Sequence, residues 1–177
     1  SLNGLKSFYG ATKLSSEFLI QEYSHAFNIK SIINRCGVIA GPWQMGKIDQ
    51  GIFAYWMLQY FFKNKLSYFN FGSKGKQVRD IIHINDLCKL IYNQILLIKN
   101  KRGNIYNVGG GVLSNISLKE TSKICSEITG NKLKIVKSKI KRINDIRVYI
   151  SNTNKVQKDF NWSISNNPKK ILYDIFL

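Results

Sequence analysis

The sequence predicts an α/β fold in which at least some of the strands are parallel. Short apolar runs alternate along the chain with longer segments of helical periodicity, and this alternation is typical of strands connected through helices. The chain has 177 residues, 44% of them hydrophobic, which is enough for one domain with a real core and ordinary for a soluble globular protein. We find neither an internal repeat nor a low-complexity linker.

Helices are expected wherever apolar spacing coincides with a start or stop signal. Asn28 is a plausible stop for the first helix, and Asp86 is expected to cap the third. Ser117 and Glu120 have the spacing of a capping box that opens the fourth. The expected ranges are 7–27, 51–64, 87–98 and 117–129, a short helix capped by Asn154 that ends before Trp162, and a last helix with Pro168 in its first turn.

Strands are expected in the short apolar runs between these helices. The expected ranges are 31–35, 66–71, 77–84, 105–108 and 133–136. Residues 37–42 contain two glycines and a proline and are expected to form a loop. Residues 72–75 and 109–111 are expected to be turns. The triple glycine at 109–111 is not expected to bind phosphate, because it follows a late strand and not the first strand of a nucleotide-binding unit.

The charge of the chain is strongly positive, with 27 basic and 10 acidic residues and a formal net charge of +17. Such a charge is found in nucleic-acid binders. The lysines are nevertheless scattered, with their densest stretch between 137 and 142, and the chain is rich in Ile, Asn and Lys throughout. We therefore favour a solvated basic surface with one local anion site, and nucleic acid is the least favoured partner.

The three cysteines, Cys36, Cys88 and Cys125, are odd in number and widely spaced, which fits neither a disulfide framework nor a zinc site. We expect a reducing, cytoplasmic location and no metal. The sequence begins without a basic and apolar targeting segment, and its longest apolar run, 51–62, is too short to span a bilayer. No membrane partner is expected.

Tyr9 and Lys13 are the first candidates for chemistry. They are four residues apart, so a helix would place both side chains on one face, one turn from each other. A positive charge close to a phenol favours its deprotonated form, which can act as a base toward a sugar hydroxyl. Taken alone, this spacing is also compatible with an ordinary helix that carries an exposed lysine and a half-buried tyrosine.

Further motifs follow this pair in an order that resembles a known family. They are Asn34-Arg35, Gly41-Pro42-Trp43-Gln44, Gln77-Val78-Arg79-Asp80, Ile84-Asn85-Asp86-Leu87, the segment 106–111 and the segment 145–151. Together they resemble the C-terminal half of the extended short-chain dehydrogenase/reductases, the NAD-dependent epimerase/dehydratase family, over nearly the whole chain. The resemblance implies the C-terminal part of an NAD(P)-binding Rossmann fold and a small substrate-binding subdomain. It assigns 1–40 and 77–108 mainly to the Rossmann part, and 41–76 and 109–177 mainly to the substrate-binding part.

The resemblance also implies site residues. Tyr9 would be the catalytic base, and Lys13 would bind the nicotinamide ribose. Arg35 and Cys36 would lie at the cofactor. The implied substrate contacts are Gln44, Gln50, Arg79, Arg142 and Asp145, with the arginines on the diphosphate because a guanidinium fork matches phosphate oxygens.

Simpler interpretations stay open for some of these residues. Arg79 could form a surface ion pair with Asp80, and Arg142 could belong to a solvated basic run. Gln44 and Gln50 could be plain loop residues. His25 is expected on a helix surface and His83 in a strand, without a catalytic role for either.

The narrower resemblance is to the CDP-paratose 2-epimerase branch of the family, carried by Gln44, by Asp49-Gln50-Gly51 and by Trp56. It implies an NAD-dependent nucleotide-sugar epimerase that oxidises and then reduces the sugar, and that forms a homodimer or a higher homo-oligomer. A nucleotide-sugar 4-epimerase or 4,6-dehydratase of the same family is a close alternative. A non-catalytic dinucleotide-binding regulator is a further one, although such proteins usually lose the Tyr/Lys pair.

Several departures from the family pattern affect these expectations. Position 38 is Val where many relatives carry a polar residue, and Asn144 replaces a usual Gly. No Gly-x-x-Gly-x-x-Gly turn follows a first strand. We therefore expect a C-terminal portion of a longer protein, without the N-terminal dinucleotide-binding βαβ unit. As it stands the chain should show no turnover, and the strands at 31–35 and 105–108 should have unpaired edges.

Overall fold

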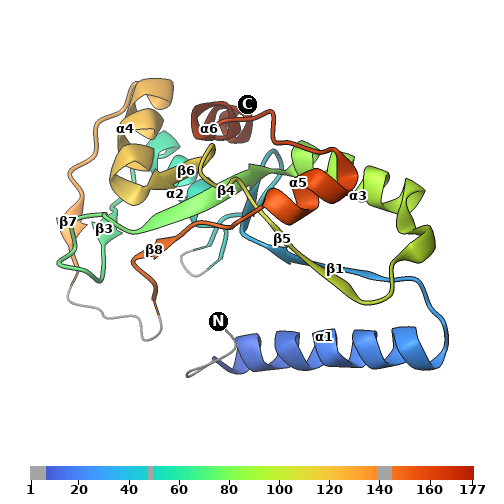
Figure 1. Cartoon of the computed structure of the whole chain (residues 1–177). Coiled ribbons are helices and arrows are strands. Elements are labelled where there is room, and N and C mark those ends of the chain that lie inside the picture. Colours follow the sequence, from blue (N-terminus) through green and yellow to red (C-terminus); the bar gives the residue numbers. More distant parts are fainter. Residues whose placement is uncertain (1–6, 48–49, 139–144) are drawn as a thin grey trace.

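The computed structural model of the chain describes residues 7–47, 50–138 and 145–177. Its strands pair mostly in parallel, and helices lie on both sides of them (Figure 1). The helices are α1 (Phe8–Ala26), α2 (Ile52–Phe61), α3 (Ile84–Leu96), α4 (Leu118–Thr129), α5 (Asn154–Phe160) and α6 (Pro168–Phe176), with a 3-10 turn at Ile98–Asn100. The predicted α/β class is confirmed.

Within the described residues the strands form three small sheets. β1 (Ile32–Cys36) pairs in parallel with β5 (Asn104–Val108), and β3 (Ser67–Tyr68) pairs in parallel with β7 (Val136–Lys137). β4 (Val78–His83) is the centre of the third sheet. It pairs in parallel with β2 (Val38–Ala40) and β8 (Val148–Tyr149), and antiparallel with β6 (Asn115–Ser117).

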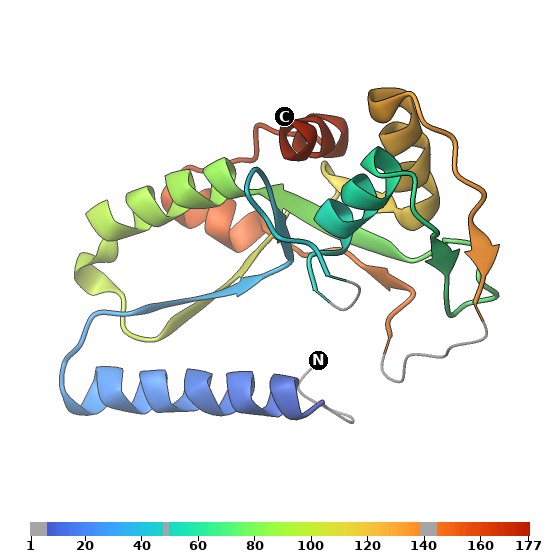
Figure 2. The ribbon, with the colours of Figure 1, turned by 180° about the vertical axis from the view of Figure 1, so that it is seen from behind.

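β4 separates two hydrophobic cores because successive side chains of a strand point to opposite faces. Ile81 belongs to a core formed with α2, α4 and α6, where Trp56 and Leu172 are fully buried. Ile82 belongs to a second core formed with α3, α5 and β5. The two views of the ribbon agree that α2, α4 and α6 gather around one end of β4 and that α3 lies beside its other end (Figures 1 and 2).

α1 packs less than any of these helices. In both views it runs along β1 and β5 on the side opposite α3 and α5 (Figures 1 and 2). Of its residues only Ser24 is buried, and the half-buried ones recur at helical spacing at Gly10, Leu14, Glu17 and Gln21. Its large apolar side chains, Phe8, Phe18, Leu19 and Tyr23, are exposed. The side of α1 that faces the rest of the molecule is therefore partly polar.

Some expectations about local structure were wrong. Residues 38–40, expected in a loop, form β2 because they pair with β4, and β6 and β8 were not expected at all. The strand expected at 133–136 is replaced by the two-residue β7, which shares only Val136 with that range, and the strand expected at 66–71 is reduced to β3. His83, not Asp86, caps α3, because its Nδ1 accepts a hydrogen bond from the Asn85 N–H at 3.0 Å. The residue before α5 is Thr153, so Asn154 begins the helix and does not cap it.

Other expectations about the fold are confirmed. Ser117 and Glu120 form the capping box of α4, and Pro168 is in the first turn of α6. β1 and β5 pair with each other, so within the described residues each has one strand neighbour in its sheet. As a separate observation, none of the described helices combines the length and the apolar character needed to cross a membrane.

Candidate functional site

Tyr9 and Lys13 lie on the same face of α1, as their spacing predicts. The Lys13 ammonium nitrogen is 5.5 Å from the centroid of the Tyr9 ring. The helix begins just before them, where the Ser7 hydroxyl accepts a hydrogen bond from the Gly10 N–H at 3.1 Å. Tyr9 is 73% exposed, so its phenol is open to a reactant. An ammonium group beside an accessible phenol is an arrangement suited to moving a proton.

A cavity of about 490 Å³ lies beside Lys13, and we call it the Lys13 cavity. It is bounded by α1, by the carboxyl ends of β1 and β5, and by residues 149–152; besides Lys13 its lining includes Glu17, Arg35 and Asn107. Ligands of parallel α/β folds bind at the carboxyl ends of strands. This cavity is therefore the natural place for a molecule that reaches the Tyr9–Lys13 pair.

Arg35 lines the Lys13 cavity but is tied to α1. Its Nε donates to both carboxylate oxygens of Glu17 at 3.0 Å, and its Nη2 donates to Oε2 at 2.5 Å. These hydrogen bonds raise the pKa of Arg35 above its ordinary value, with burial acting in the opposite direction. Cys36 is exposed, does not line the cavity, and donates to the Asn34 carbonyl at 3.7 Å. Of the two residues expected at the cofactor, the structure brings Arg35 next to Lys13.

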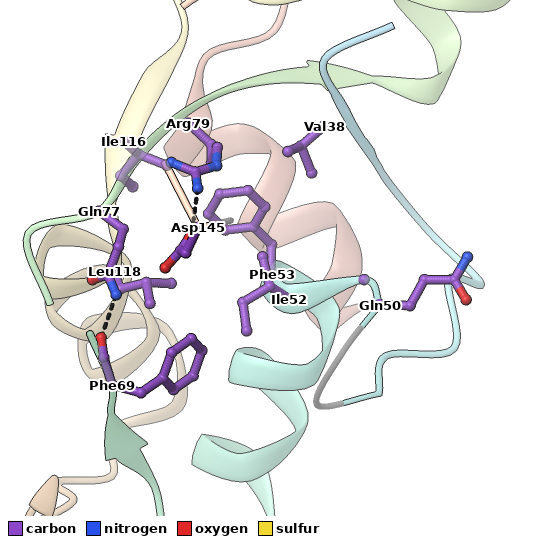
Figure 3. Close-up of a pocket in the computed structure, with 11 residues that line it drawn as sticks. Val38, Gln50, Ile52, Phe53, Phe69, Gln77, Arg79, Ile116, Leu118 and Asp145 are labelled. Carbon is purple, nitrogen blue, oxygen red and sulfur yellow. Dashed lines mark hydrogen bonds and ion pairs between the residues drawn. The ribbon is translucent and has the colours of Figure 1, made fainter. Parts of the chain in front are cut away.

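A second cavity of about 330 Å³ surrounds Arg79 and Asp145, and we call it the Arg79 cavity (Figure 3). Arg79 Nη2 donates to Asp145 Oδ1 at 2.7 Å, and the Asn70 side-chain amide donates to Asp145 Oδ2 at 2.8 Å. Arg79 Nη1 donates to the Val78 carbonyl at 2.8 Å. The remaining walls are mostly apolar and include Val38, Ile52, Phe53, Phe69, Ile116 and Leu118. The cavity thus combines a guanidinium with an apolar, partly aromatic surface.

Pairing of β8 with β4 places Asp145 at this cavity. Val78 is opposite Val148 and Arg79 is opposite Tyr149, and the Val78 N–H donates to the Arg147 carbonyl at 2.9 Å. The expected convergence of Arg79 and Asp145 is confirmed, although 66 residues separate them. The ion pair of Arg79 is with Asp145 and not with Asp80, which is fully buried. Arg142, expected at the same cleft, lies outside the described residues, as does Asp49.

The two glutamines proposed as substrate contacts differ in their surroundings. Gln44 Nε2 donates to the Ile39 carbonyl at 3.0 Å, which ties its loop to β2. Gln50 is exposed and contributes to the lining of the Arg79 cavity, but its side chain extends away from Arg79 and Asp145 (Figure 3). Trp56, part of the narrower resemblance, is a core residue whose Nε1 donates to Ser122 Oγ at 2.8 Å.

Sequence reasoning missed three residues of the Arg79 cavity region: Phe69, Asn70 and Gln77. Gln77 is buried, and its side-chain amide donates to the Phe69 carbonyl (Figure 3). A signal for Gln77 was present, because it precedes Arg79 by two residues and side chains two apart on a strand share a face. No comparable local signal marked Asn70, which bonds to Asp145 from a turn far away in the sequence.

The described residues contain no group of three or more His, Cys, Asp and Glu side chains that could hold a metal ion. A site for an organic cofactor would have to be built from Tyr9, Lys13 and the Lys13 cavity. An ammonium and a phenol fit ribose hydroxyls, which both donate and accept hydrogen bonds.

Comparison with known proteins identifies the family. Residues 3–109 match the NAD dependent epimerase/dehydratase family. The chain is 27% identical over 158 residues to the CDP-paratose 2-epimerase of Salmonella typhi, covering 88% of this chain and 46% of that protein. It is 28% identical over 166 residues to the UDP-glucose 4-epimerase of Corynebacterium glutamicum, covering 88% and 49%. The chain therefore spans about half the length of these curated relatives.

Solved structures agree at the level of the fold. The UDP-glucuronic acid 4-epimerase of Bacillus cereus, in complex with UDP-glucuronic acid and NAD, superimposes with a TM-score of 0.84 at 22% identity. The match covers 98% of this chain and 55% of that one. The UDP-glucose 4-epimerase of Thermus thermophilus, a complex with NAD, gives a TM-score of 0.82 at 19% identity over 98% of this chain and 54% of that one. On the family match and the shared fold, the chain belongs to the NAD dependent epimerase/dehydratase family.

Proposed function

We propose that the whole protein is an NAD-dependent nucleotide-sugar epimerase that acts on a CDP-sugar at carbon 2. The observation that carries an enzyme of this kind is the Tyr9–Lys13 pair, one helical turn apart and exposed beside a cavity at the carboxyl ends of two parallel strands. The similarity to the Salmonella CDP-paratose 2-epimerase supports the choice of a CDP-sugar and of carbon 2. Family membership alone would be compatible with a regulator. Retention of an accessible phenol next to an ammonium favours an enzyme.

In this proposal Tyr9 takes the proton from a sugar hydroxyl and later returns it. Lys13, whose ammonium nitrogen lies 5.5 Å from the centroid of the Tyr9 ring, is proposed to bind the ribose of NAD. Further candidates for cofactor contacts are Arg35, which lines the same cavity as Lys13, and Cys36. When bound, NAD supplies a reversible two-electron oxidant, so the reaction has no net redox change.

Arg79 and the apolar walls of its cavity are the proposed nucleotide site. The bonds to Asp145 and Val78 use two of the five N–H donors of a guanidinium, and the others can meet phosphate oxygens. Asp145 is proposed to contact the nucleotide ribose, with Arg142 as a second arginine for the diphosphate. Gln50 is a better candidate for a sugar or base contact than Gln44, whose amide holds the Ile39 carbonyl.

The proposed division into two parts follows the two sides of β4. We propose that 1–40 and 77–108 form mainly the cofactor part, and that 41–76 and 109–177 form mainly the substrate part. The second core supports this division in outline, since it joins β5 and α3, which both belong to 77–108. That core also includes α5, so the C-terminal stretch contributes to both sides.

We further propose that the whole protein is cytoplasmic and forms a homodimer or a higher homo-oligomer. The exposed apolar side chains of α1 support an additional packing surface there. Light scattering coupled to size exclusion on the whole protein would test the assembly. A strictly monomeric protein would contradict it.

A second candidate function is a nucleotide-sugar 4-epimerase. It is favoured by the similar identity to the Corynebacterium UDP-glucose 4-epimerase. A 4,6-dehydratase is the third member of this set, supported by matches to two such enzymes over a smaller part of the chain. All three candidates share the Tyr9–Lys13 pair and differ in the carbon that reacts.

The test is an activity assay of the whole protein, purified with NAD, against CDP-, UDP- and dTDP-sugars, with products followed by NMR. Inversion at carbon 2 of a CDP-sugar supports the first proposal. Inversion at carbon 4 supports the second, and a keto sugar formed with loss of water supports the third. Nucleotide binding without turnover of any sugar would contradict an enzyme and favour a dinucleotide-binding regulator.

A further inference from the structure

Asp80 is a fully buried acidic residue next to Arg79, and the roles proposed above do not use it. Because neighbouring side chains of β4 point to opposite faces, Arg79 reaches its own cavity while Asp80 points the other way. Asp80 Oδ2 accepts hydrogen bonds from two backbone N–H groups, those of Gly111 and Ser151, each at 3.2 Å. Asp80 therefore joins β4 to the turn after β5 and to the segment after β8.

Two glycines lie close to the Asp80 carboxyl group and leave the space that it occupies. Gly37 and Gly109 directly follow β1 and β5. A Cβ added to Gly37 would be 2.8 Å from Asp80 Oδ1, and one added to Gly109 would be 2.1 Å from Asp80 Oδ2. Because both positions are glycine, the Asp80 side chain can reach the C-terminal ends of the parallel strands β1 and β5. Ligands of parallel α/β folds bind at that end of the strands.

The segment that Asp80 holds contributes to both cavities. We call residues 145–152 the strap. Asp145, at its start, lines the Arg79 cavity, and Tyr149, Ile150, Ser151 and Asn152, at its end, line the Lys13 cavity. One short segment is therefore a shared wall of the proposed nucleotide site and the proposed reaction site.

The strap has little apolar packing to keep it in place. Residues 146–150 are all exposed. Its attachments to the rest of the described chain are mainly polar. They include the ion pair of Asp145 with Arg79, the hydrogen bond from the Asn70 amide to Asp145, the pairing of β8 with β4, and the hydrogen bond from the Ser151 N–H to Asp80. A segment with few buried apolar contacts opens locally at low free-energy cost, so each of these bonds matters for its position.

We propose that Asp80 is a positioning residue that fixes the strap on β4 and so sets the geometry between the Arg79 cavity and the Lys13 cavity. Its effect on nucleotide binding rests on the function proposed above. Its effect on the strap itself does not. Asp80 acts through Asp145 and the backbone of the strap, without contact to a substrate.

The experiment compares D80N and D80A with D86N in the whole protein. Asp86 is the matched control, because it is equally buried and accepts hydrogen bonds from Ser165 and Asn166, outside both cavities. Hydrogen exchange measured by mass spectrometry reports on the strap and on α4, and calorimetry measures the affinity for CDP and UDP. D80N keeps one oxygen acceptor but loses the charge, and D80A loses both hydrogen bonds.

We expect amide exchange in the strap to be about 10-fold faster in D80N and up to about 100-fold faster in D80A, with exchange in α4 unchanged in D80N. Nucleotide affinity should fall about 10-fold in D80N, in line with the loss of one well-placed charged contact. D86N should alter neither strap exchange nor nucleotide affinity.

Other outcomes would overturn the inference. Unchanged strap exchange in D80N would show that Asp80 does not hold the strap, and equal acceleration in α4 would show a purely global effect on stability. Faster strap exchange without a change in affinity would show that the strap does not position the nucleotide site. If the wild-type protein bound neither CDP nor UDP, the proposed function would fail, while strap exchange would still decide the role of Asp80.

Discussion

The two candidate sites are supported in different ways. The Arg79 cavity lies against the core of α2, α4 and α6, where Leu172 is completely buried. Tyr9 and Lys13 lie on α1, whose Leu19 is 59% exposed and whose single buried residue is Ser24. The Arg79 cavity, the proposed nucleotide site, is thus assembled from segments within the described chain. The proposed reaction site depends on α1, a helix whose residues are mostly exposed.

The difference shows where the stability of each site comes from. Burial of apolar surface contributes roughly 25 cal/mol per Å², and the side of α1 toward β1 and β5 gains little of it. That side is held instead by polar contacts, such as the Glu17–Arg35 pair and the hydrogen bond from the Gln21 amide to the Gly103 carbonyl at 3.3 Å. A helix with polar contacts on one side and exposed apolar side chains on the other leaves its main hydrophobic surface free to pack against another element or chain.

The largest expected effect is a loss of turnover without a loss of nucleotide affinity. In the whole protein, Y9F should lower turnover by about 100- to 10,000-fold, the range for loss of a general acid–base group. CDP affinity should stay unchanged, because no residue of α1 lines the Arg79 cavity, the proposed nucleotide site. Rate and calorimetric measurements on the same samples test this. Y23F, which removes another exposed hydroxyl of α1, is the control, and equal loss of activity in both variants would remove the catalytic role of Tyr9.

The second prediction uses the same substitution in the two regions. L172A should lower the free energy of unfolding of this chain by about 2–5 kcal/mol, because it leaves a cavity in the core. L19A should change it by no more than about 0.5 kcal/mol, as for an exposed position. Urea denaturation followed by circular dichroism measures both. Equal destabilisation would mean that α1 is buried in solution and that the contrast between the two regions is false.

Substitution of Arg79 tests the proposed nucleotide site separately from the Tyr9–Lys13 pair. R79Q should weaken CDP and UDP binding by about 10- to 100-fold, because it removes a charged hydrogen-bond donor from the phosphate. R102Q removes an exposed arginine of the turn before β5 and should leave the affinity unchanged. Calorimetric titration of both variants provides the test. An equal decrease in both would indicate that general positive charge, and not the cavity, attracts the nucleotide.

Acid stability should depend on Asp86, which joins the second core to the segment before α6. Burial opposes its charge, but hydrogen bonds from Ser165 and Asn166 outweigh burial and hold the pKa of Asp86 below its ordinary value. This stabilisation is therefore complete above the unfolded pKa of about 4 and is lost as the pH falls through the folded value. D86N should cost about 1–3 kcal/mol at neutral pH, and this difference from wild type should shrink in acid.

Thermal unfolding of wild type and D86N between pH 7 and pH 3 measures that effect. A constant difference in stability across the range would show that the Asp86 charge makes no contribution. D86N should leave the affinity for CDP at neutral pH unaltered, because Ser165 and Asn166 line neither cavity.

The smallest expected signal concerns the 177-residue chain by itself. Its contacts to NAD would come from Tyr9, Lys13 and the Lys13 cavity, and a few hydrogen bonds fall short of the roughly −8 kcal/mol of micromolar affinity. Titration with NAD should therefore give no measurable heat, while CDP should still bind at the Arg79 cavity. Micromolar NAD binding by this chain would show that α1 and the Lys13 cavity are together a sufficient cofactor site.

Local signals predicted the longer elements well and the short strands poorly. The helix carrying Tyr9 and Lys13 and the capping box at Ser117 depend on residues within one turn of each other, so the sequence contains the relevant information. β2, β6 and β8 have two or three residues each and exist because they pair with β4. Pairing of that kind is decided by the tertiary structure and leaves little trace in local composition.

The same distinction applies to the candidate sites. The Tyr9–Lys13 face follows from helical periodicity, whereas the meeting of Arg79 and Asp145 was expected only through the family resemblance. The capping role assigned to Asp86 failed because His83, three residues earlier, supplies the acceptor, and the Asp86 carboxyl group turns instead to Ser165 and Asn166. No short-range pattern distinguishes a capping carboxylate from one that holds a distant segment.

The glycines around β4 have a consequence for how this sequence can vary. A Cβ on Gly110 would be 2.1 Å from the Ser114 carbonyl oxygen and 2.3 Å from that of Ile81, and backbone atoms cannot move aside as a flexible side chain can. In a complete substitution library, position 110 should therefore accept fewer replacements than exposed residues of α1 such as Phe18. The strictest sequence requirement would then fall on a residue without a side chain, because two backbone segments approach each other there and not because of contact with a substrate.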